Sequence, residues 1–197
     1  MTGKFLKQWK DKEVILASAS PRRKALMKGL DIPFRVVIPE NIPELYPETL
    51  SVEDIPLFLA RQKAEAHRSL VKTLSVLLTA DTIVVQNGVV IQKPSDRRDA
   101  EMILQKLSGR MHTVLTGVCL RSPEKERCFT AITKVYFSTL SGYEIAYYLD
   151  TYKPYDKAGA YGIQEWIGYV GIDRIEGSFF NVMGLPVHQV YHYLKEF

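Results

Sequence analysis

Hydrophobic residues in this chain gather in short runs, and polar or amphipathic segments separate those runs. The run from 75 to 85, SVLLTADTIVV, is almost continuously apolar and β-branched, which is typical of a buried strand. The pair Asn87-Gly88 lies between two apolar runs and predicts a hairpin of residues 83–85 with 89–91. The predicted strands are residues 14–16, 34–38, 75–85, 89–91, 112–121, 127–140 and 166–175.

Segments with helical spacing alternate with these strands. Ser20 can cap a helix that begins at Pro21, and Gly29 is placed to end it. Ser141 and Glu144 match a capping box that opens another helix. Further helices are predicted at residues 51–70, at 96–107 and after residue 186. Because strands and helices mix along the sequence and hairpins occur, the predicted class is α/β with a mixed sheet.

The first strand, its small-residue turn and the following helix form a candidate anion site. The first turn of the helix carries Arg22 and Arg23, where the helix dipole disfavours cations unless an anion is bound. Backbone donors, the dipole and two guanidinium groups together would bind a phosphate. For an arginine pair alone, two solvated side chains on a surface helix are the simpler interpretation.

Asp81 interrupts the apolar run 75–85 and needs an explanation. A buried carboxylate is costly unless it is paired, bound to metal or open to a cleft. The structural alternative is an ion pair with one nearby Arg or Lys. Lys63 shares a helical face with Leu59 and Ala66, so its ammonium either reaches outward to solvent or points into a cleft.

Two irregular segments are candidate ligand loops. Residues 39–48 hold three prolines with Glu40, Glu44 and Glu48, and Glu53 follows shortly after, which predicts a stiff acidic loop. For any single glutamate there, simple solvation is the alternative. Residues 154–165 have two glycines, mixed charge and no clear period.

Composition narrows the class of protein. The 197 residues are 46% hydrophobic and 24% charged with a formal charge of +4, which fits one soluble domain and an anionic small-molecule ligand. The basic residues are spread along the chain, so no nucleic-acid partner is expected. No run approaches the roughly 20 apolar residues of a membrane span, and residues 1–13 are too polar for a signal peptide. We therefore expect a cytoplasmic protein without a membrane partner.

The metal-ligand residue types give weaker signals. Cys119 and Cys128 lie within predicted strands, without a second Cys or His at metal-ligand spacing, and are interpreted as reduced thiols in or near the core. His188 and His192 lie one helical turn apart, but no third ligand is close in sequence.

Several cations, a strand carboxylate and an acidic loop together fit the hydrolysis of a phosphoanhydride. Cations neutralise a polyphosphate, and carboxylates hold a metal ion or deprotonate water. The chain has no Gly-x-x-x-x-Gly-Lys-Ser/Thr loop, which disfavours a P-loop enzyme.

Seven motifs are distributed along nearly the whole chain: SASPRR (18–23), ARQKA (60–64), TADT (79–82), KP (93–94), LSGRMHTVLTGV (107–118), DKAGAYGIQ (156–164) and GSFFNVMGLP (177–186). In this order they resemble the motifs of the Maf nucleotide pyrophosphatases. DKAGAYGIQ is similar to the subgroup that acts on dTTP and UTP rather than the one that acts on 7-methyl-GTP. The resemblance implies a fold related to inosine triphosphate pyrophosphatases: an elongated mixed sheet flanked by helices, with two lobes around a nucleotide cleft. It also implies a homodimer and a divalent cation, Mg²⁺ ahead of Mn²⁺.

The same resemblance assigns roles to individual residues. Asp81 matches the proton acceptor that activates water against the α-phosphorus, and Glu44 matches a loop glutamate that binds the metal or the water. The cations matched to phosphate binding or catalysis are Arg22, Arg23, Lys63 and Lys93, and Lys157 is a further cation on a candidate ligand loop. Ser18 and Ser20 would add donors, while Arg22, Thr82 and Gln164 match specificity positions. The carboxamide of Gln164 offers one donor and one acceptor, complementary to the O4 and N3–H edge of uracil and thymine.

Two positions depart from the family pattern, and two other functions stay open. Pro43 precedes Glu44 where an acidic residue is usual, and Gln92 precedes Lys93 where glycine is common. One alternative is a nucleotide-binding regulator of septum formation that acts through partners without turnover. The other, a nucleic-acid-binding module, would need a clustered basic face with exposed aromatics.

Overall fold

The computed structural model describes residues 9–38 and 42–197. Most of the polar segment 1–13 and Glu40 of the acidic loop therefore lie outside the described residues. The chain divides into two compact units. Unit 1 comprises Met1–Asp81, Thr116–Ala131 and Gly184–Phe197, and unit 2 comprises Thr82–Leu115 and Ile132–Met183.

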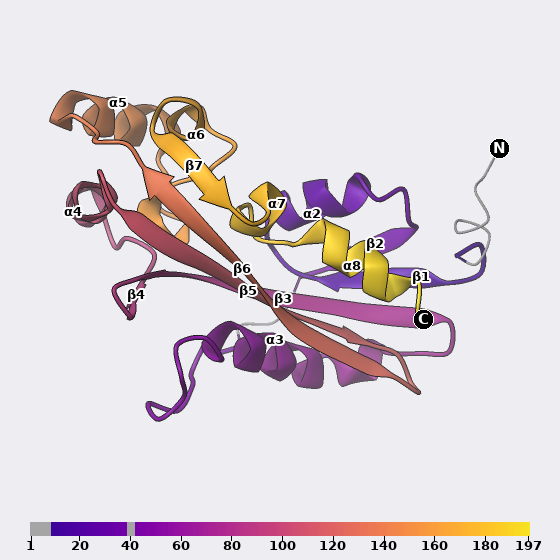
Figure 1. The fold of residues 1–197 in the computed structure, drawn as a ribbon. Coiled ribbons are helices and arrows are strands. Elements are labelled where there is room, and N and C mark those ends of the chain that lie inside the picture. Colours follow the sequence, from indigo (N-terminus) through magenta and orange to yellow (C-terminus); the bar gives the residue numbers. More distant parts are fainter. Residues whose placement is uncertain (1–8, 39–41) are drawn as a thin grey trace. The chain divides into compact units, whose positions relative to one another are not determined.

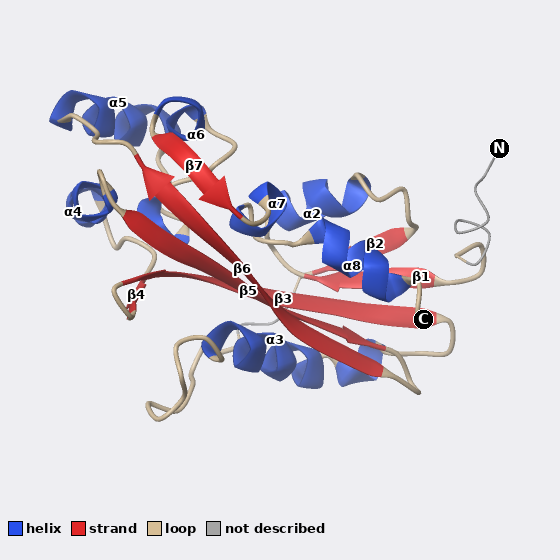
Figure 2. Ribbon diagram, in the orientation of Figure 1, coloured by secondary structure: helices blue, strands red, loops and turns tan. Residues whose placement is uncertain are grey.

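In the described part of the chain, seven strands form one mixed sheet (Figure 2). They are β1 Glu13–Ala17, β2 Phe34–Val37, β3 Ser75–Gln86, β4 Val89–Ile91, β5 Met111–Arg121, β6 Glu126–Phe137 and β7 Ile172–Glu176. Their order is β2-β1-β3-β5-β6-β7, and β4 pairs with β3. The β1–β2 and β1–β3 pairs are parallel, whereas β3–β4 and β6–β7 are antiparallel. The predicted mixed α/β class is confirmed.

The helices begin largely where the sequence predicts. They are α2 Pro21–Lys28, α3 Ile55–Ala66, α4 Arg97–Leu107, α5 Gly142–Tyr152, α6 Trp166–Val170, α7 Phe179–Val182 and α8 Val187–Leu194, with 3₁₀ turns η1 Arg68–Leu70 and η2 Ala158–Ala160. Ser20 caps α2 by accepting from the Arg23 amide, and the capping box of Ser141 and Glu144 opens α5. Among residues 9–38 and 42–197, no helix is long and apolar enough to cross a membrane.

In unit 1, helices cover both faces of the parallel strands. Figure 1 shows α2 and α8 on one face and α3 on the other. Ala60 and Ala64 of α3 pack against Ile15, Leu77 and Cys119 of the strands. The small alanines let the helix approach the sheet closely.

One glycine sets how close this approach is. A Cβ on Gly117 of β5 would lie 2.2 Å from the carbonyl carbon of Pro56, so the strand backbone meets the first turn of α3 directly. No other residue fits at that contact without moving the backbone.

Unit 2 has its own core, in which Leu104 and Leu107 of α4 join Tyr148 and Leu149 of α5. The β3–β4 hairpin turns at Asn87 and Gly88, both with positive φ, as the sequence predicts. Val84 pairs with Ile91 and Gln86 with Val89.

The prediction of one strand over residues 166–175 is wrong, because its first half is α6. Trp, Ile, Tyr and Val favour strands as isolated residues, but Ile167 turns into the unit 2 core. Gly168 lies so close to the Ile163 carbonyl that a Cβ could not be accommodated. This backbone contact and the burial of Ile167 override the local strand preference, and the strand β7 begins only at Ile172.

Two further helices differ from the sequence prediction, one in its bounds and one in its presence. The helix predicted at 51–70 is α3, which begins after Asp54 and ends at Ala66 before a separate 3₁₀ turn. The short helix α7 was not predicted from the sequence.

Candidate active site

A buried carboxylate and a lysine form the centre of the site in unit 1. Asp81 lies in the middle of β3 and is 6% exposed. Lys63 extends from α3 and places its Nζ 2.5 Å from Asp81 Oδ1 and 2.8 Å from Glu44 Oε1. The ion pair proposed as the structural alternative for Asp81 is therefore present. Lys63 does not extend into solvent but joins two carboxylates from different segments.

The half-buried Arg23 adds a second cation to this group. From the first turn of α2 its Nε donates to the Gly184 carbonyl and its Nη1 donates to the Ala80 carbonyl, each at 2.8 Å. Desolvation lowers the pKa of Arg23, and the charge of Asp81 opposes that shift. The interpretation as a freely solvated side chain is thus wrong for Arg23.

The turn before α2 presents the predicted serines. The Ser18 hydroxyl accepts from the Ser20 amide at 3.2 Å, and the Ser20 hydroxyl accepts from the Arg23 amide at 3.3 Å. Arg22 is half-buried beside them. A helix start with oriented amides and arginines in its first turn can bind an anion.

Burial makes Asp81 a stronger base than an exposed aspartate. Desolvation raises the pKa of its carboxyl group, against the charges of Lys63 and Arg23. A carboxylate with a raised pKa accepts a proton from water more readily at neutral pH.

Unit 2 contains a second group of predicted residues. Lys157 Nζ lies 2.8 Å from Asp156 Oδ1 and 3.2 Å from Glu165 Oε1. Gln164 is half-buried, its Nε2 donates to Glu165 Oε1 at 3.5 Å, and its Oε1 is buried without a hydrogen-bond partner among the described residues. This orientation leaves the acceptor of the carboxamide available to a ligand. Thr82 is half-buried and follows Asp81 along β3, and Lys93 is exposed after β4.

Sequence reasoning missed Glu165 and Tyr148. The Tyr148 hydroxyl donates to Glu165 Oε2 and accepts from the Gly162 amide at 3.0 Å, so the pair fixes the backbone on which Gln164 stands. Burial raises the pKa of Tyr148, which keeps this hydroxyl a donor. The sequence feature that could have pointed to Glu165 is its position directly after the motif DKAGAYGIQ.

Among residues 9–38 and 42–197, two sets of side chains have donors that suit a metal ion. Oxygens of Asp81 and Glu44 converge on one ammonium group, Lys63 Nζ, and hard carboxylate oxygens suit Mg²⁺ or Mn²⁺. Among the described residues, Cys119, Glu126 and Cys128 also form a group whose ligand atoms lie within 4.8 Å of one another. Sulfur ligands favour softer ions than Mg²⁺.

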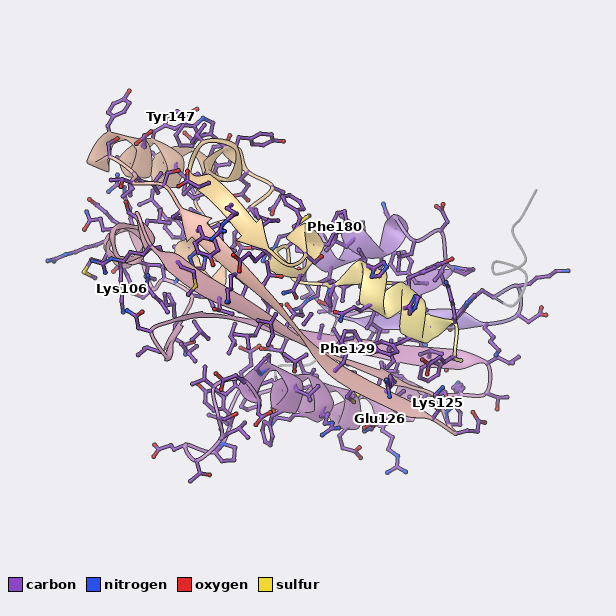
Figure 3. The ribbon with its side chains drawn as sticks, viewed as in Figure 1. Lys106, Lys125, Glu126, Phe129, Tyr147 and Phe180 are labelled. Atoms are coloured by element: carbon purple, nitrogen blue, oxygen red, sulfur yellow. The ribbon has the colours of Figure 1, made fainter. Side chains whose placement is uncertain are left out.

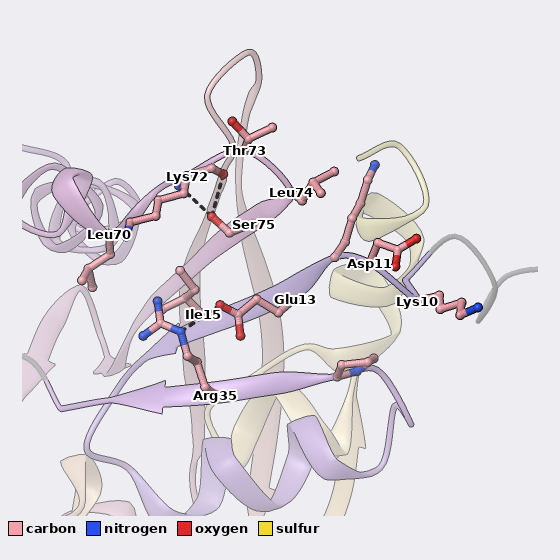
Figure 4. A pocket seen from close by; sticks show the side chains of 12 residues that line it. Lys10, Asp11, Glu13, Ile15, Arg35, Leu70, Lys72, Thr73, Leu74 and Ser75 are labelled. Carbon is pink, nitrogen blue, oxygen red and sulfur yellow. Dashed lines mark hydrogen bonds and ion pairs between the residues drawn. The ribbon is translucent and has the colours of Figure 1, made fainter.

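A hollow of about 510 Å³ lies beside Ser75, where β3 begins (Figure 4). Glu13, Arg35 and Ser75 contribute to its lining, and Arg35 Nε donates to Glu13 Oε1 at 2.9 Å. Six residues along a strand separate Ser75 from Asp81, a distance of roughly 20 Å. The hollow is therefore separate from the Asp81 site.

The mixed sheet, the arginine-bearing helix start and the buried carboxylate define an α/β protein with a candidate anion site. Its fold is similar to that of a HAM1 protein from Coxiella burnetii, with a TM-score of 0.50 at 16% identity over 94% of this chain and 100% of that one. The sequence profile described as Maf-like protein matches residues 13–197. The chain belongs to the Maf-like family, and the predicted resemblance is confirmed.

Two curated relatives are similar over nearly their whole length. A protein of Porphyromonas gingivalis named dTTP/UTP pyrophosphatase is 52% identical over 195 residues, which cover 98% of each chain. A protein of the same name from Bacteroides fragilis is 52% identical over 184 residues, covering 93% of this chain and 95% of that one.

Proposed function

We propose that this protein hydrolyses dTTP and UTP to the nucleoside monophosphate and pyrophosphate. The relatives that carry this name are 52% identical over nearly the full chain. The observation that carries the chemistry is the buried Asp81 carboxylate held beside Lys63 and Arg23. A regulator that binds nucleotides without turnover is not favoured, because the relatives are named as pyrophosphatases and the ionisable site is intact.

In this proposal Asp81 takes a proton from the water that attacks the α-phosphorus. Its raised pKa suits a general base, and the charge of Lys63 favours the ionised form of the carboxyl group. Arg23 is held by two main-chain carbonyls, so its charge needs little reorganisation to stabilise a phosphate. Ser18, Ser20 and Arg22 supply further donors at the start of α2.

The residues of unit 2 are assigned to substrate recognition. The free Oε1 of Gln164 accepts from N3–H of thymine or uracil, and its Nε2 donates to O4. Glu165 and Tyr148 hold this carboxamide in place. Lys93 and Lys157 offset phosphate charge, and Thr82 contributes to substrate choice.

The remaining parts of the proposal concern cofactor and assembly. Glu44 and Asp81 would hold a divalent cation, Mg²⁺ ahead of Mn²⁺, which supplies charge to offset the leaving pyrophosphate. We further propose that residues 1–197 act as one Maf-like domain, as a cytoplasmic homodimer without nucleic-acid or membrane partners. Coverage of 98% of a relative's length supports the single domain.

A panel of nucleoside triphosphates tests the proposal. Each is incubated with the purified protein and Mg²⁺, and the products are separated by anion exchange. Monophosphate and pyrophosphate, formed fastest from dTTP or UTP, support both the reaction and the role of Gln164. Release of a diphosphate and inorganic phosphate would mean attack at the γ-phosphorus, and binding without turnover would favour the regulator.

A further inference from the structure

The two cysteines of the chain lie together in unit 1. Cys119 belongs to β5 and Cys128 to β6, neighbouring strands that only residues 122–125 connect. Their Sγ atoms are 2.6 Å apart, and both thiols are free. The sequence predicts reduced thiols in or near the core, and the pairing of β5 with β6 brings the two together.

The two thiols differ in access. Cys119 is fully buried and packs against Ala60 and Ala64 of α3. Cys128 is half-buried and is therefore the more accessible residue of the two. Figure 3 shows Glu126 next to Lys125 where β6 begins, and a Glu126 oxygen lies 3.4 Å from Cys128 Sγ.

The surroundings divide the two sulfurs into a nucleophile and a buried partner. Hydrogen bonds with Cys119 and with the Arg61 guanidinium lower the pKa of Cys128, against burial and the charge of Glu126. The hydrogen bond with Cys128, followed by burial, raises the pKa of Cys119. A lowered pKa beside an arginine and partial exposure are the properties of a reactive thiol.

We propose that Cys119 and Cys128 form a thiol–disulfide exchange site that reacts with small-molecule disulfides. The Cys128 thiolate attacks one sulfur of the disulfide, whose S–S bond breaks and releases one thiolate. Cys119 then loses its proton to that thiolate or to solvent, and its sulfur attacks Cys128 Sγ. The mixed disulfide breaks, a second thiol leaves, and one protein disulfide replaces two protein thiols.

A thiophilic cation held by Cys119, Glu126 and Cys128 is the competing occupant. Two thiolates on a tetrahedral zinc ion are roughly 3.7 Å apart, given Zn–S bonds of about 2.3 Å. The sulfurs here are 2.6 Å apart, closer than such an ion allows. Arg121 already pairs with Glu126, and Arg61 lies beside Cys128. The positive charges of these two guanidinium groups oppose the binding of a metal cation. The geometry favours bonding between the sulfurs.

Oxidised glutathione and intact-mass measurement test the exchange directly. Wild-type protein should lose about 2 Da and both thiols that are titratable in denaturant, with release of about two glutathione molecules per chain. Cys128→Ser should not react. Cys119→Ser should stop at a mixed disulfide on Cys128, heavier by about 305 Da. That trapped adduct identifies Cys128 as the attacking thiol.

A matched pair of arginine variants tests the role of Arg61. Arg61→Gln should slow the first step about threefold, because loss of the guanidinium raises the pKa of Cys128 and the smaller thiolate fraction outweighs the gain in nucleophilicity. The control is Arg68→Gln. Arg61 lies on α3 and the exposed Arg68 follows the end of that helix, so Arg68→Gln should leave the rate unchanged.

Three results would overturn the proposal. One is a wild-type protein that keeps both thiols or accumulates two glutathione adducts. Another is an adduct that forms on Cys119 in Cys128→Ser. The third is stoichiometric zinc binding by reduced wild-type protein that protects both thiols and is lost in Cys128→Ser.

Discussion

Lys63 and Asp81 form an ion pair in which Lys63 Nζ lies 2.5 Å from Asp81 Oδ1. Asp81 belongs to β3, a strand that is buried along almost its whole length. The pair couples a cation of α3 to the proposed base on β3. Because Lys63 also contacts Glu44, one ammonium group influences both carboxylates that we assign to catalysis and metal binding.

Replacing Lys63 by Met should weaken the base without removing it. Lys63 opposes the desolvation that raises the pKa of Asp81, so its loss raises that pKa further. We expect kcat/KM for dTTP at neutral pH to fall at least about a hundredfold, with partial recovery at alkaline pH. Lys106→Met, at an exposed lysine of α4, is the control. Identical acidic limbs in the pH–rate profiles of wild type and Lys63→Met would contradict this coupling.

Asp81→Asn should stabilise the fold at neutral pH. Since the folded-state pKa of Asp81 is raised, the stability linked to its proton is present below the unfolded pKa and is lost as the pH rises through the folded pKa. Asparagine is neutral at every pH and escapes that loss. Melting temperatures should favour Asp81→Asn at neutral pH and converge with wild type at acid pH. A lower melting temperature of the variant at neutral pH would show that the buried charge is stabilising.

Glu165→Gln should impair selection of the substrate's nucleobase more than it impairs turnover. Glu165 accepts from Tyr148, pairs with Lys157 and orients Gln164. A neutral amide weakens the pairing and lets the carboxamide rotate. The preference for dTTP over dCTP, measured as a ratio of kcat/KM, should fall about tenfold. Glu176→Gln, at an exposed glutamate of the same unit, should keep the ratio, and a Glu165→Gln ratio equal to wild type would remove Glu165 from recognition.

Gly117→Ala should destabilise the protein, because the new Cβ would lie 2.2 Å from the Pro56 backbone. We expect the free energy of unfolding in urea to fall by about 3 kcal/mol. Gly142→Ala adds the same methyl group where no atom lies within 4 Å and should change it by less than about 0.5 kcal/mol. Equal effects of the two substitutions would mean that β5 and α3 are not in backbone contact.

Features that depend on neighbouring residues could be predicted from the sequence. Ser20 caps α2, Ser141 and Glu144 form a capping box, and Asn87-Gly88 turns a hairpin, because each uses hydrogen bonds or dihedral angles within a few residues. The family motifs predicted roles for Asp81 and Lys63 in one site, and the structure shows that these two side chains are in contact.

Features that depend on tertiary packing could not be predicted in the same way. The sequence left open whether Lys63 points outward, and only the meeting of α3, β3 and the acidic loop fixes it on Asp81 and Glu44. Residues 166–170 have strand-forming side chains but form α6 because Ile167 fills the unit 2 core. The cysteine pair depends on the pairing of β5 with β6, which brings residues nine positions apart together.

The most direct test of the central claim compares wild type with Asp81→Asn in dTTP hydrolysis and in dTTP binding. If Asp81 is the proton acceptor, the variant loses turnover by about a thousandfold. It still binds dTTP by calorimetry with an affinity close to that of wild type, because Arg23 and the start of α2 are unchanged. Turnover within a fewfold of wild type would contradict the account, because the attacking water would then not depend on Asp81.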